Sequence, residues 1–421
     1  MSPVTRSRLI VVGQGYVGLP LAMRAVEVGF DVVGVDVDQS RVDALASGIS
    51  FVEDVADETV AGALATGRYD VRTSLEGLDG FDHAIISVPT PLRESLPDLS
   101  YVEAAARSIG RLLQPGATVV LESTTSPGTT AEVLVPLLET ASGLSAGRDF
   151  HVGFSPERID PGNPDWSFTS TPKIVSGIDE ASLARVTMLY DALVDVTVPV
   201  AGTREAELAK LIENTFRHVN IALVNELAVA AHDLGVNIWQ ALEAAGTKPF
   251  GFMKFLPGPG VGGHCLPVDP SYLSWEVRRK LGRSLRFVEL ANEVNEGMPE
   301  YVVRRLEALL NDEARAVRGA RVLLVGLAYK PDSGDVREAP AVRVARLLAS
   351  RGALVTAVDP HVSERDWPAG VVRAELDAAA VEEADVSVVL TLHSDVDLSP
   401  LRGRLVLDTR NVVDEGSRVV L

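Results

Sequence analysis

The chain is short of cysteine, of lysine and of long hydrophobic runs. One cysteine among 421 residues excludes a disulfide within the chain. No run of about 18 apolar residues is present, so we expect a soluble, cytoplasmic protein without a membrane partner. The net charge of −19 argues against nucleic-acid or anionic-membrane partners, because phosphate groups would be repelled without local basic patches.

A metal site is not expected from the sequence. The single cysteine has no partner thiol, and the histidines show none of the spacings that are typical of metal ligands. These histidines are His83, His151, His218, His232, His264, His361 and His393.

The composition indicates a folded protein of more than one domain. Hydrophobic residues make up 46% of the chain, and 421 residues exceed what one hydrophobic core usually serves. We therefore expect two or three domains. Because lysine is rare here, a lysine within a motif is informative.

The N-terminal segment predicts a dinucleotide-binding unit. A buried strand, Leu9 to Val12, leads into the glycine turn Gly13 to Gly18, a helix and a second strand that ends at Asp36. The glycines allow a tight turn and a close approach of the backbone, and the helix N-terminus faces the pyrophosphate. Asp36 can accept from the ribose hydroxyls and would repel a 2′-phosphate, which favours NAD over NADP. The nearby Arg41 could accommodate a 2′-phosphate, so NADP stays an alternative cofactor.

Two further strands, His83 to Val88 and Thr118 to Glu122, are each followed by a loop rich in small hydroxyl residues. Loops at the carboxyl ends of parallel strands often form ligand-binding sites. The same loops can alternatively be ordinary turns whose Ser and Thr residues cap the following helices. The residues expected at the cofactor are Gly13, Gly15, Tyr16, Val17, Gly18, Asp36, Arg41, Pro89, Thr90 and Thr124.

A long helix is predicted from Thr203 to about Leu234, because the stretch lacks Gly and Pro and repeats apolar residues at helical spacing. Lys210 and Asn214 lie four residues apart and so share one face. Lys210 can alternatively be an exposed helix lysine. Two more helices are expected, from Leu285 to Glu296 and from Pro299 to Leu310.

The C-terminal part repeats the strand, helix and strand plan. Strand Val322 to Val325, helix Ala341 to Ser350 and strand Leu354 to Val358 follow one another without a glycine fingerprint. We infer a second βαβ-type domain that binds something other than a dinucleotide. Its first loop carries Lys330 and Arg337, where a phosphate could sit, and the last predicted strands are Val386 to Leu390 and Leu405 to Leu407.

The only cysteine lies in a stretch rich in glycine and proline, from Pro257 to Pro270. Such residues make a rigid loop that presents a side chain at a set point. Cys265 can be a small buried hydrophobe in a turn. The preceding glycine pair and Asp269 favour a nucleophile, provided that a neighbour stabilises its thiolate.

Together these motifs resemble the UDP-glucose/GDP-mannose dehydrogenase family over nearly the whole chain. The matching pieces are Gly13 to Pro20, Pro89-Thr90-Pro91, Ser155-Pro156-Glu157-Arg158, Lys210 with Asn214, Gly262-Gly263-His264-Cys265 with Asp269, Lys330 to Arg337, and Asp408-Thr409-Arg410. The resemblance implies oxidation of the C6 alcohol of a sugar nucleotide to a carboxylate with two NAD molecules in turn. We expect an α/β fold of two Rossmann-like doubly wound domains joined by a long central helix, divided into residues 1–202, 203–311 and 312–421.

The resemblance also implies roles for individual residues. Cys265 would add to the intermediate aldehyde, giving a thiohemiacetal and then a thioester that is hydrolysed. Lys210 and Asn214 would stabilise the developing oxyanion, and Asp269 would orient water or tune the thiol. Glu157, together with Thr124, would activate the hydrolytic water. Some members carry a second glutamate four residues after this one, where the chain has Pro161.

Within the family, the segments around Glu157 and Cys265 are most similar to those of enzymes that act on UDP-N-acetylglucosamine. UDP-N-acetylmannosamine and UDP-glucose stay open as substrates, and a dinucleotide-binding regulator is the alternative that is not an enzyme. The central helix is similar to the family's dimer core, so a homodimer is expected. The resemblance places the following residues at the substrate: Glu157, Arg158, Lys210, Asn214, Arg217, Phe255, Gly260, Gly263, Lys330, Arg337 and Arg410.

Overall fold

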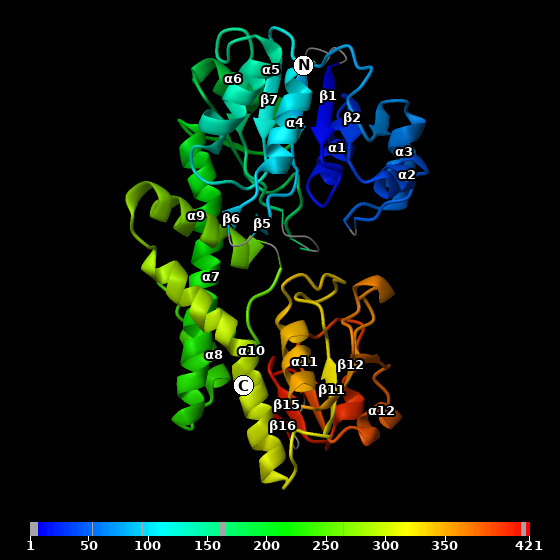
Figure 1. Ribbon diagram of the computed structural model, residues 1–421, viewed down its shortest axis with the longest axis vertical. Coiled ribbons are helices and arrows are strands. Elements are labelled where there is room, and N and C mark those ends of the chain that lie inside the picture. The colour runs from blue at the N-terminus through cyan, green and yellow to red at the C-terminus, as the bar shows by residue number, and fades with distance from the viewer. Residues whose placement is uncertain are drawn as a thin grey trace. The chain divides into compact units, whose positions relative to one another are not determined.

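The computed structural model describes residues 7–52, 54–93, 96–159, 163, 165–263, 265–413 and 418–421. It divides into two compact units, Met1–Glu213 and Asn214–Leu421. Figure 1 shows that each unit carries its own sheet with helices packed around it. Among the described residues, no helix is both long and apolar enough to cross a membrane.

The first unit is built on an eight-stranded sheet with the strand order β10-β9-β8-β7-β4-β1-β2-β3. All neighbouring strands run parallel except β8 and β9, which are antiparallel. The strands are β1 (Arg8–Val12), β2 (Asp31–Val35), β3 (Tyr69–Arg72), β4 (His83–Ile86), β7 (Thr118–Leu121), β8 (His151–Phe154), β9 (Lys173–Gly177) and β10 (Thr197–Pro199), beside a small hairpin of β5 (Leu92–Arg93) and β6 (Leu96–Pro97).

Both faces of this sheet are covered by helices, which explains why its central strands are continuously apolar. Leu9 and Val11 of β1 pack in one hydrophobic cluster, and Ile10 between them packs in the other. The covering helices are α1 (Gly18–Glu27), α2 (Gln39–Ala46), α3 (Asp57–Ala65), α4 (Ser100–Gly110), α5 (Val135–Ser142), which continues the short helix Thr130–Leu134, and α6 (Glu180–Asp191).

The second unit contains a six-stranded parallel sheet in the order β13-β12-β11-β14-β15-β16. The strands are β11 (Arg321–Val325), β12 (Leu354–Val358), β13 (Val372–Arg373), β14 (Val386–Val389), β15 (Val406–Asp408) and β16 (Arg418–Val420). The helices are α7 (Thr203–Asp233), which begins in the first unit, α8 (Ile238–Gly246), α9 (Cys265–Leu281), α10 (Arg286–Asp312), α11 (Pro340–Ser350) and α12 (Ala378–Glu383), with short 3-10 turns at Glu364–Asp366 and Ser399–Leu401.

The two sheets repeat the same local plan, as the sequence predicts. The first strand of each pairs in parallel with the strand after its crossover helix, β1 with β2 and β11 with β12. The turn glycine at the end of each first strand donates to the last residue of the second strand: Gly13 N to Val35 O at 2.7 Å and Gly326 N to Val358 O at 2.9 Å. The predicted fold class of two Rossmann-like units and a long central helix is confirmed.

Three local predictions differ from the structure. The two helices expected on either side of residue 298 form the single helix α10, which runs through Pro299. A proline inside a helix costs about 3 kcal/mol, and here the buried Met298, Tyr301 and Val302 of α10 pack in the core of the second unit and offset it. The strand β16 also follows the strand predicted to be the last.

The third difference concerns the cysteine segment. It was expected to continue as a loop beyond Cys265, but α9 begins at this residue. Pro267 is then the third helical residue, in the first turn, where backbone N–H groups have no partner within the helix. A proline is therefore tolerated there, and its presence does not exclude a helix.

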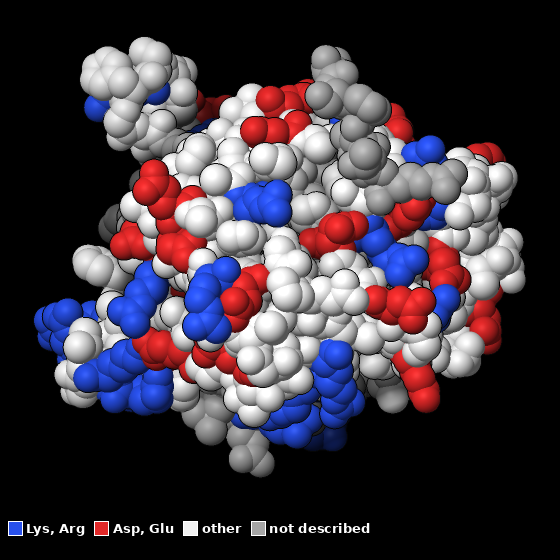
Figure 2. Space-filling model, turned by 90° about the horizontal axis from the view of Figure 1, so that it is seen from above, with Lys and Arg blue, Asp and Glu red and all other residues white. Residues whose placement is uncertain are grey.

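The surface carries charges of both signs. Figure 2 shows acidic and basic side chains next to one another over much of one face. Ion pairs such as Arg24 with Glu27, 2.8 Å apart, join charges of opposite sign on the surface. Such pairs each contribute at most about 1 kcal/mol, so the fold depends on the two apolar cores.

Candidate active site

The glycine turn between β1 and α1 is closely packed on one side and open on the other. A Cβ on Gly18 would lie 1.8 Å from the carbonyl oxygen of Gly13, so glycine is required there by the chain itself. At Gly15, by contrast, none of the described residues places a heavy atom within 4 Å of the position of a Cβ. The space above Gly15 is therefore available to a ligand that approaches the backbone, as a pyrophosphate does.

Asp36 is fixed beside this turn at the end of β2. One of its carboxylate oxygens accepts from Gln14 N at 3.0 Å, and the other accepts from Asp38 N at 3.0 Å. Arg41 lies 3.6 Å from Asp36 and 3.8 Å from Asp38, so its charge is balanced by two carboxylates. Tyr16 and Val17 follow Gly15 in the turn that precedes α1, and Tyr16 is exposed.

The loops after β4 and β7 are joined to each other and to the glycine turn. Thr90 Oγ1 donates to Thr124 O at 2.8 Å, and Ser87 Oγ donates to Gly13 O at 3.1 Å. Since β1, β2, β4 and β7 are parallel neighbours, the residues predicted at the cofactor all lie at the same edge of the sheet. An open glycine cradle, a fixed carboxylate and two hydroxyl loops fit NAD at this edge.

Glu157, the predicted base, belongs to a buried charge network that no local sequence pattern reveals. Lys173 Nζ lies 3.2 Å from Glu157 Oε2 and 3.0 Å from Glu122 Oε1, and Tyr190 OH donates to Glu122. Burial raises the pKa of Glu122, although Lys173 opposes the shift. Burial disfavours the charge of Lys173, but Glu122 and Glu157 outweigh it and raise its pKa.

Topology brings this network together. Glu122 follows β7 and Glu157 follows β8, while Lys173 begins β9, which runs antiparallel to β8. The start of β9 therefore lies at the same edge as the ends of the other two strands. The rarity of lysine was the one signal in the sequence, but its two carboxylate partners are 16 and 51 residues away.

The segment that carries Glu157 is anchored to the first half of α7. Lys210 Nζ donates to the main-chain oxygen of Glu157 at 2.5 Å. Arg158 pairs with Glu213 at 2.7 Å and donates to Pro172 O at 2.6 Å. In this structure the guanidinium of Arg158, which was predicted at the substrate, holds the loop in place.

In the second unit, Asn214 and Asp269 form a buried pair. Asn214 Nδ2 donates to Asp269 Oδ2, and Arg217 donates to Asn214 Oδ1. Asn214 is fully buried and Asp269 is 3% exposed. Cys265 is the first residue of α9, so Asp269 follows it by about one helical turn. The side chain of Cys265 and all of His264 lie outside the described residues.

A cavity of about 490 Å³ lies at the carboxyl ends of β11, β14 and β15. Its volume is in the range of small-molecule sites, and it lies where the strand order of the sheet reverses. Lys330 and Arg410 line it together with Gly260, as the resemblance implies for the substrate. The other lining residues are Ile221, Leu256, Gly258, Val261, Gly262, Leu266, Tyr329, Pro331, Thr391, Leu392 and Val412.

Arg410 is held at this cavity by its own loop. Its Nε donates to Leu390 O at 2.7 Å, and its main-chain N donates to Asp408 at 2.9 Å. Desolvation lowers the pKa of Arg410 to about 10, so the guanidinium stays charged at neutral pH. A fixed cation at the edge of a cavity suits a phosphate group.

Three other predicted substrate residues have partners outside the cavity lining. Arg337 donates to Asp335 at 2.9 Å, and its carbonyl oxygen accepts from Gly263 N at 3.0 Å. Phe255 packs edge to face on Phe216, with ring centroids 5.8 Å apart. Arg217 binds Asn214, as described above.

The turn that follows β11 differs from the open glycine turn of the first unit. Asp359, the counterpart of Asp36, accepts from Leu327 N at 2.7 Å and from Ala328 N at 2.9 Å. Asp36 binds Gln14 N in the same way as Asp359 binds Leu327 N, but Asp359 also binds Ala328 N, the counterpart of Gly15 N. This geometry agrees with the inference that the second unit binds a different ligand.

Both units match domains of one known protein family. Residues 7–194 match the NAD-binding domain of the UDP-glucose/GDP-mannose dehydrogenase family, 204–297 its central domain and 323–415 its UDP-binding domain. The chain is 35% identical over 418 residues to the UDP-N-acetyl-D-mannosamine dehydrogenase of Pyrococcus horikoshii, covering 97% of this chain and 96% of that protein. It is 40% identical over 363 residues to the UDP-N-acetyl-D-glucosamine 6-dehydrogenase of Pseudomonas aeruginosa, covering 85% and 84%.

A solved structure of UDP-D-ManNAc dehydrogenase from Pyrococcus horikoshii superposes with a TM-score of 0.90 at 34% identity and covers 98% of both chains. The NAD-binding match agrees with the open glycine turn and with the preference for NAD that Asp36 predicts. The chain therefore belongs to the UDP-glucose/GDP-mannose dehydrogenase family and is an NAD-dependent UDP-sugar dehydrogenase.

Proposed function

We propose that the protein oxidises the C6 hydroxyl of UDP-N-acetylglucosamine to the carboxylate in two successive steps, with Cys265 as the covalent nucleophile. The observation that carries this proposal is the buried pair of Asp269 and Asn214, in which Asp269 follows Cys265 by one turn of α9. A helix N-terminus stabilises a thiolate through its partial positive charge. The start of α9 is thus suited to a nucleophilic cysteine.

When bound, NAD would supply the hydride acceptor for both oxidation steps, and the proton of the C6 hydroxyl would be lost to water in the first. Between them the Cys265 thiolate adds to the C6 aldehyde and forms a thiohemiacetal, so the aldehyde cannot escape. Loss of the second hydride and of the hydroxyl proton leaves a thioester. Water then adds to the thioester carbonyl, and expulsion of the thiolate gives the carboxylate and restores Cys265.

Charged and amide groups of α7 support these steps. Lys210 and Asn214 stabilise the oxyanion that develops at C6, as a cation and an amide donor. Glu157 accepts the proton of the hydrolytic water, and Thr124 helps to orient that water. Pro161, which stands where some relatives have a second glutamate, lies outside the described residues. Lys173 supports the carboxylate of Glu157 from the buried side.

A small panel of substrates tests the reaction class and the sugar together. Purified protein is incubated with NAD and limiting UDP-N-acetylglucosamine, UDP-N-acetylmannosamine or UDP-glucose, and NADH is measured per mole of sugar. We expect a ratio of two and the highest kcat/KM with UDP-N-acetylglucosamine, in line with the 40% identity to the Pseudomonas relative. A ratio of one indicates a simple alcohol dehydrogenase, and no NADH from any sugar indicates a binding protein.

Replacing the cysteine tests the covalent mechanism. Cys265→Ser should lower formation of the uronic acid by about a thousandfold or more, because a serine hydroxyl is a far weaker nucleophile without a base to activate it. NADH binding, measured by fluorescence, should be unchanged. Full oxidation at an undiminished rate by this variant contradicts the covalent mechanism.

We also propose that the protein is a homodimer through α7. Phe216, Leu223 and Leu227 are 46%, 50% and 46% exposed on this helix, and such an apolar stripe favours burial against a second copy. Leu223→Glu should convert a dimer to a monomer in analytical ultracentrifugation, while Val37→Glu, at an 84% exposed position in the first unit, should not. A monomeric unmodified protein contradicts this assembly.

We further propose that the chain is divided into three domains, at residues 1–202, 203–311 and 312–421. Each range contains one of the matched family segments. The cytoplasmic location expected from the sequence stays a prediction.

A further inference from the structure

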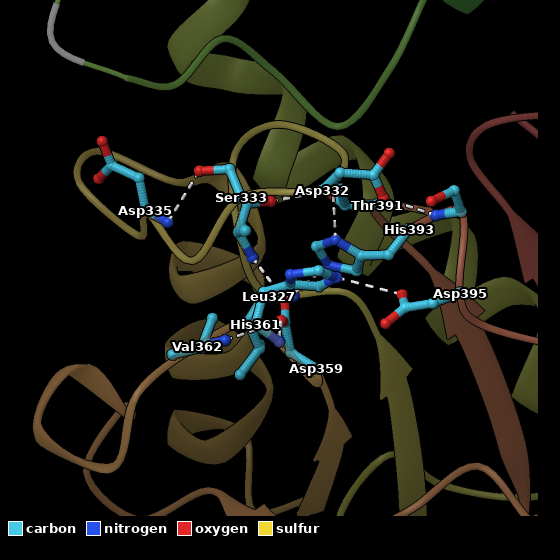
Figure 3. Close-up of polar contacts among 12 residues, drawn as sticks. Leu327, Asp332, Ser333, Asp335, Asp359, His361, Val362, Thr391, His393 and Asp395 are labelled. Atoms are coloured by element: carbon cyan, nitrogen blue, oxygen red, sulfur yellow. Dashed lines mark hydrogen bonds and ion pairs between the residues drawn. The ribbon is translucent and has the colours of Figure 1, made fainter. Parts of the chain in front are cut away.

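Three potential metal ligands meet in the second unit at a place that the reaction does not use. One ring nitrogen from each of His361 and His393 and one carboxylate oxygen of Asp332 lie within 4.8 Å of one another. Figure 3 shows the two imidazoles beside each other, with Asp332 and Asp395 near their ring nitrogens. The rings are stacked, with centroids 4.6 Å apart.

The topology of the sheet explains why residues so far apart in the sequence meet here. Asp332 is in the loop after β11, His361 follows β12 and His393 follows β14. These strands are parallel neighbours in the order β12-β11-β14, so their three loops leave the same edge. The three residues have no short ligand spacing in the sequence, so no local pattern indicates a metal here.

Hydrogen bonds define which nitrogen of His393 can bind a metal. Its Nε2 lies 3.0 Å from Asp359 Oδ2, and its Nδ1 accepts from the main-chain N of Asp332 at 3.0 Å. A main-chain N–H can only donate, so Nδ1 is the nitrogen that offers a lone pair, and the proton of the neutral ring lies on Nε2, facing Asp359.

His361 is arranged in the same way. Its Nε2 lies 3.1 Å from Asp395 Oδ1, while its Nδ1 has no hydrogen-bond partner among the described residues. Metal-bound histidines almost always donate their second ring N–H to a carboxylate, which fixes the ring and makes the ligating nitrogen more basic. Both histidines of this cluster already have that carboxylate.

The third ligand is the carboxylate of Asp332. One of its oxygens accepts from Ser394 N at 2.6 Å, which helps to fix its orientation. With Asp359 and Asp395, three carboxylates surround the two imidazoles. The local charge therefore favours a cation.

We propose that Asp332, His361 and His393 bind one zinc ion. Two imidazole nitrogens and one carboxylate oxygen are typical zinc donors, whereas calcium and magnesium prefer sites made of oxygen. Zinc bonds of about 2.0 to 2.2 Å place tetrahedral ligands about 3.3 Å apart, so the cluster must contract by about 1 Å or more. Water completes the coordination.

When the three ligands move together around the metal, one hydrogen bond is replaced by a metal–nitrogen bond. The main-chain N–H of Asp332 must leave His393 Nδ1 so that the metal can take its place. Asp332 has a φ of 55°, in the left-handed region that a residue other than glycine adopts only at a cost. A shift of this residue can relieve that strain, so the loop is suited to move.

The ion would act on the nucleotide cavity next to it. Tyr329, Lys330 and Pro331, which line the cavity, immediately precede Asp332 in the same loop. A metal that ties Asp332 to the loops after β12 and β14 would hold this loop in one conformation. Zinc would then be a structural or regulatory ion outside the oxidation chemistry.

Cobalt serves as a spectroscopic probe for this site. The full chain with Cys265→Ser, which removes the thiol, is stripped with a chelator and titrated with Co²⁺, and zinc is then added as a competitor. We expect one equivalent of Co²⁺ with the visible absorption of a tetrahedral site, and its displacement by one equivalent of zinc. This readout does not depend on whether the proposed oxidation is correct.

Three variants locate the ion. His361→Gln should abolish stoichiometric binding, and Asp395→Asn, which keeps all three ligands but loses an orienting carboxylate, should weaken it by about 10- to 100-fold. His232→Gln, at an exposed position of α7, should bind as the parent does. Circular dichroism checks the fold of each variant. The proposal is overturned if the parent takes up no stoichiometric Co²⁺ or zinc, or if His361→Gln binds as tightly as the parent.

Discussion

Lys173 Nζ lies 3.2 Å from Glu157 Oε2, and this contact gives the proposed base a buried cationic partner. The side chain of Lys173 is 4% exposed and also pairs with Glu122, which is fully enclosed. A buried charge without a partner would cost several kcal/mol, so the three groups depend on one another. Glu157 therefore has a fixed position although Pro161 replaces the second glutamate of some relatives.

The first prediction concerns Lys173→Met. Without the ammonium group the carboxylate of Glu157 loses its anchor, so hydrolysis of the thioester should slow by about 100-fold. The hydride steps do not use Glu157 and should persist. Stopped-flow absorbance should then show a rapid burst of NADH followed by a slow steady state, and Lys173→Arg should restore much of the steady rate.

A matched lysine provides the control. Lys254 forms an exposed pair with Glu243 at 2.8 Å, so Lys254→Met should change neither phase. If the burst and the steady rate of Lys173→Met fall together and arginine restores neither, Lys173 is needed only for folding, and the positioning role is wrong.

The second prediction compares two glycines of one turn. Gly15→Ala adds a methyl group where the described chain leaves open space, so thermal stability should be unchanged. The same methyl would intrude on the pyrophosphate and weaken NADH binding by about ten- to hundredfold. Gly18→Ala would place its methyl 1.8 Å from Gly13 O and should destabilise the fold by about 3 kcal/mol or more.

Fluorescence titration with NADH and thermal unfolding measure the two effects. The comparison separates a glycine that serves the ligand from one that serves the fold. Equal losses of stability in both variants, or unchanged NADH affinity in Gly15→Ala, contradict the interpretation of the open turn as the cofactor cradle.

The elements predicted best from the sequence have local signals. The strand, turn and helix from Leu9 onward follow from a short apolar run and glycine spacing, and the structure has β1 and α1 there. The repeat at Val322 was recognised from the same order of elements. The helix predicted from Thr203 matches α7 because its apolar positions repeat without a break.

The parts that were missed depend on contacts between distant residues. Pro299 indicates a helix boundary locally, but burial of its neighbours keeps α10 continuous. Lys173 meets Glu122 because β9 turns back along β8, and His361 meets His393 because two crossovers end at one edge. A short stretch of sequence does not show which distant residues it will contact. These features can therefore be recognised only in the folded structure.

The third prediction concerns Lys330→Met in the second unit. Lys330 lines the cavity of about 490 Å³ beside Arg410, so loss of its charge should weaken UDP binding by about ten- to hundredfold. Calorimetry with UDP alone measures this effect without the reaction. Affinity for NADH should be unchanged, since the cofactor turn lies in the first unit.

Lys280→Met, on the last turn of α9 and paired with Glu276 at 2.8 Å, is the matched control. It should bind UDP as the unmodified protein does. Unchanged UDP affinity in Lys330→Met would mean that the nucleotide does not reach this end of the cavity.

The fourth prediction is a dependence of stability on pH that comes from Asp359. Its pKa in the folded protein is about 2, below the value of about 3.9 that is typical of an unfolded chain. A carboxyl group whose pKa is lowered by folding stabilises the fold above its unfolded pKa and loses this effect as the pH falls toward its folded pKa. The contribution is about 2 kcal/mol, present at neutral pH and lost between about pH 4 and pH 2.

Urea unfolding at several pH values checks this expectation. Asp359→Asn should be less stable than the unmodified protein at pH 7, and the two stability curves should approach each other as the pH falls from about 4 to about 2. Asp312→Asn, at an exposed position at the end of α10, should leave the shape of the curve unchanged. If the curves of Asp359→Asn and the unmodified protein stay parallel through this range, the carboxylate of Asp359 does not hold the turn at Leu327 and Ala328 in its ionised form.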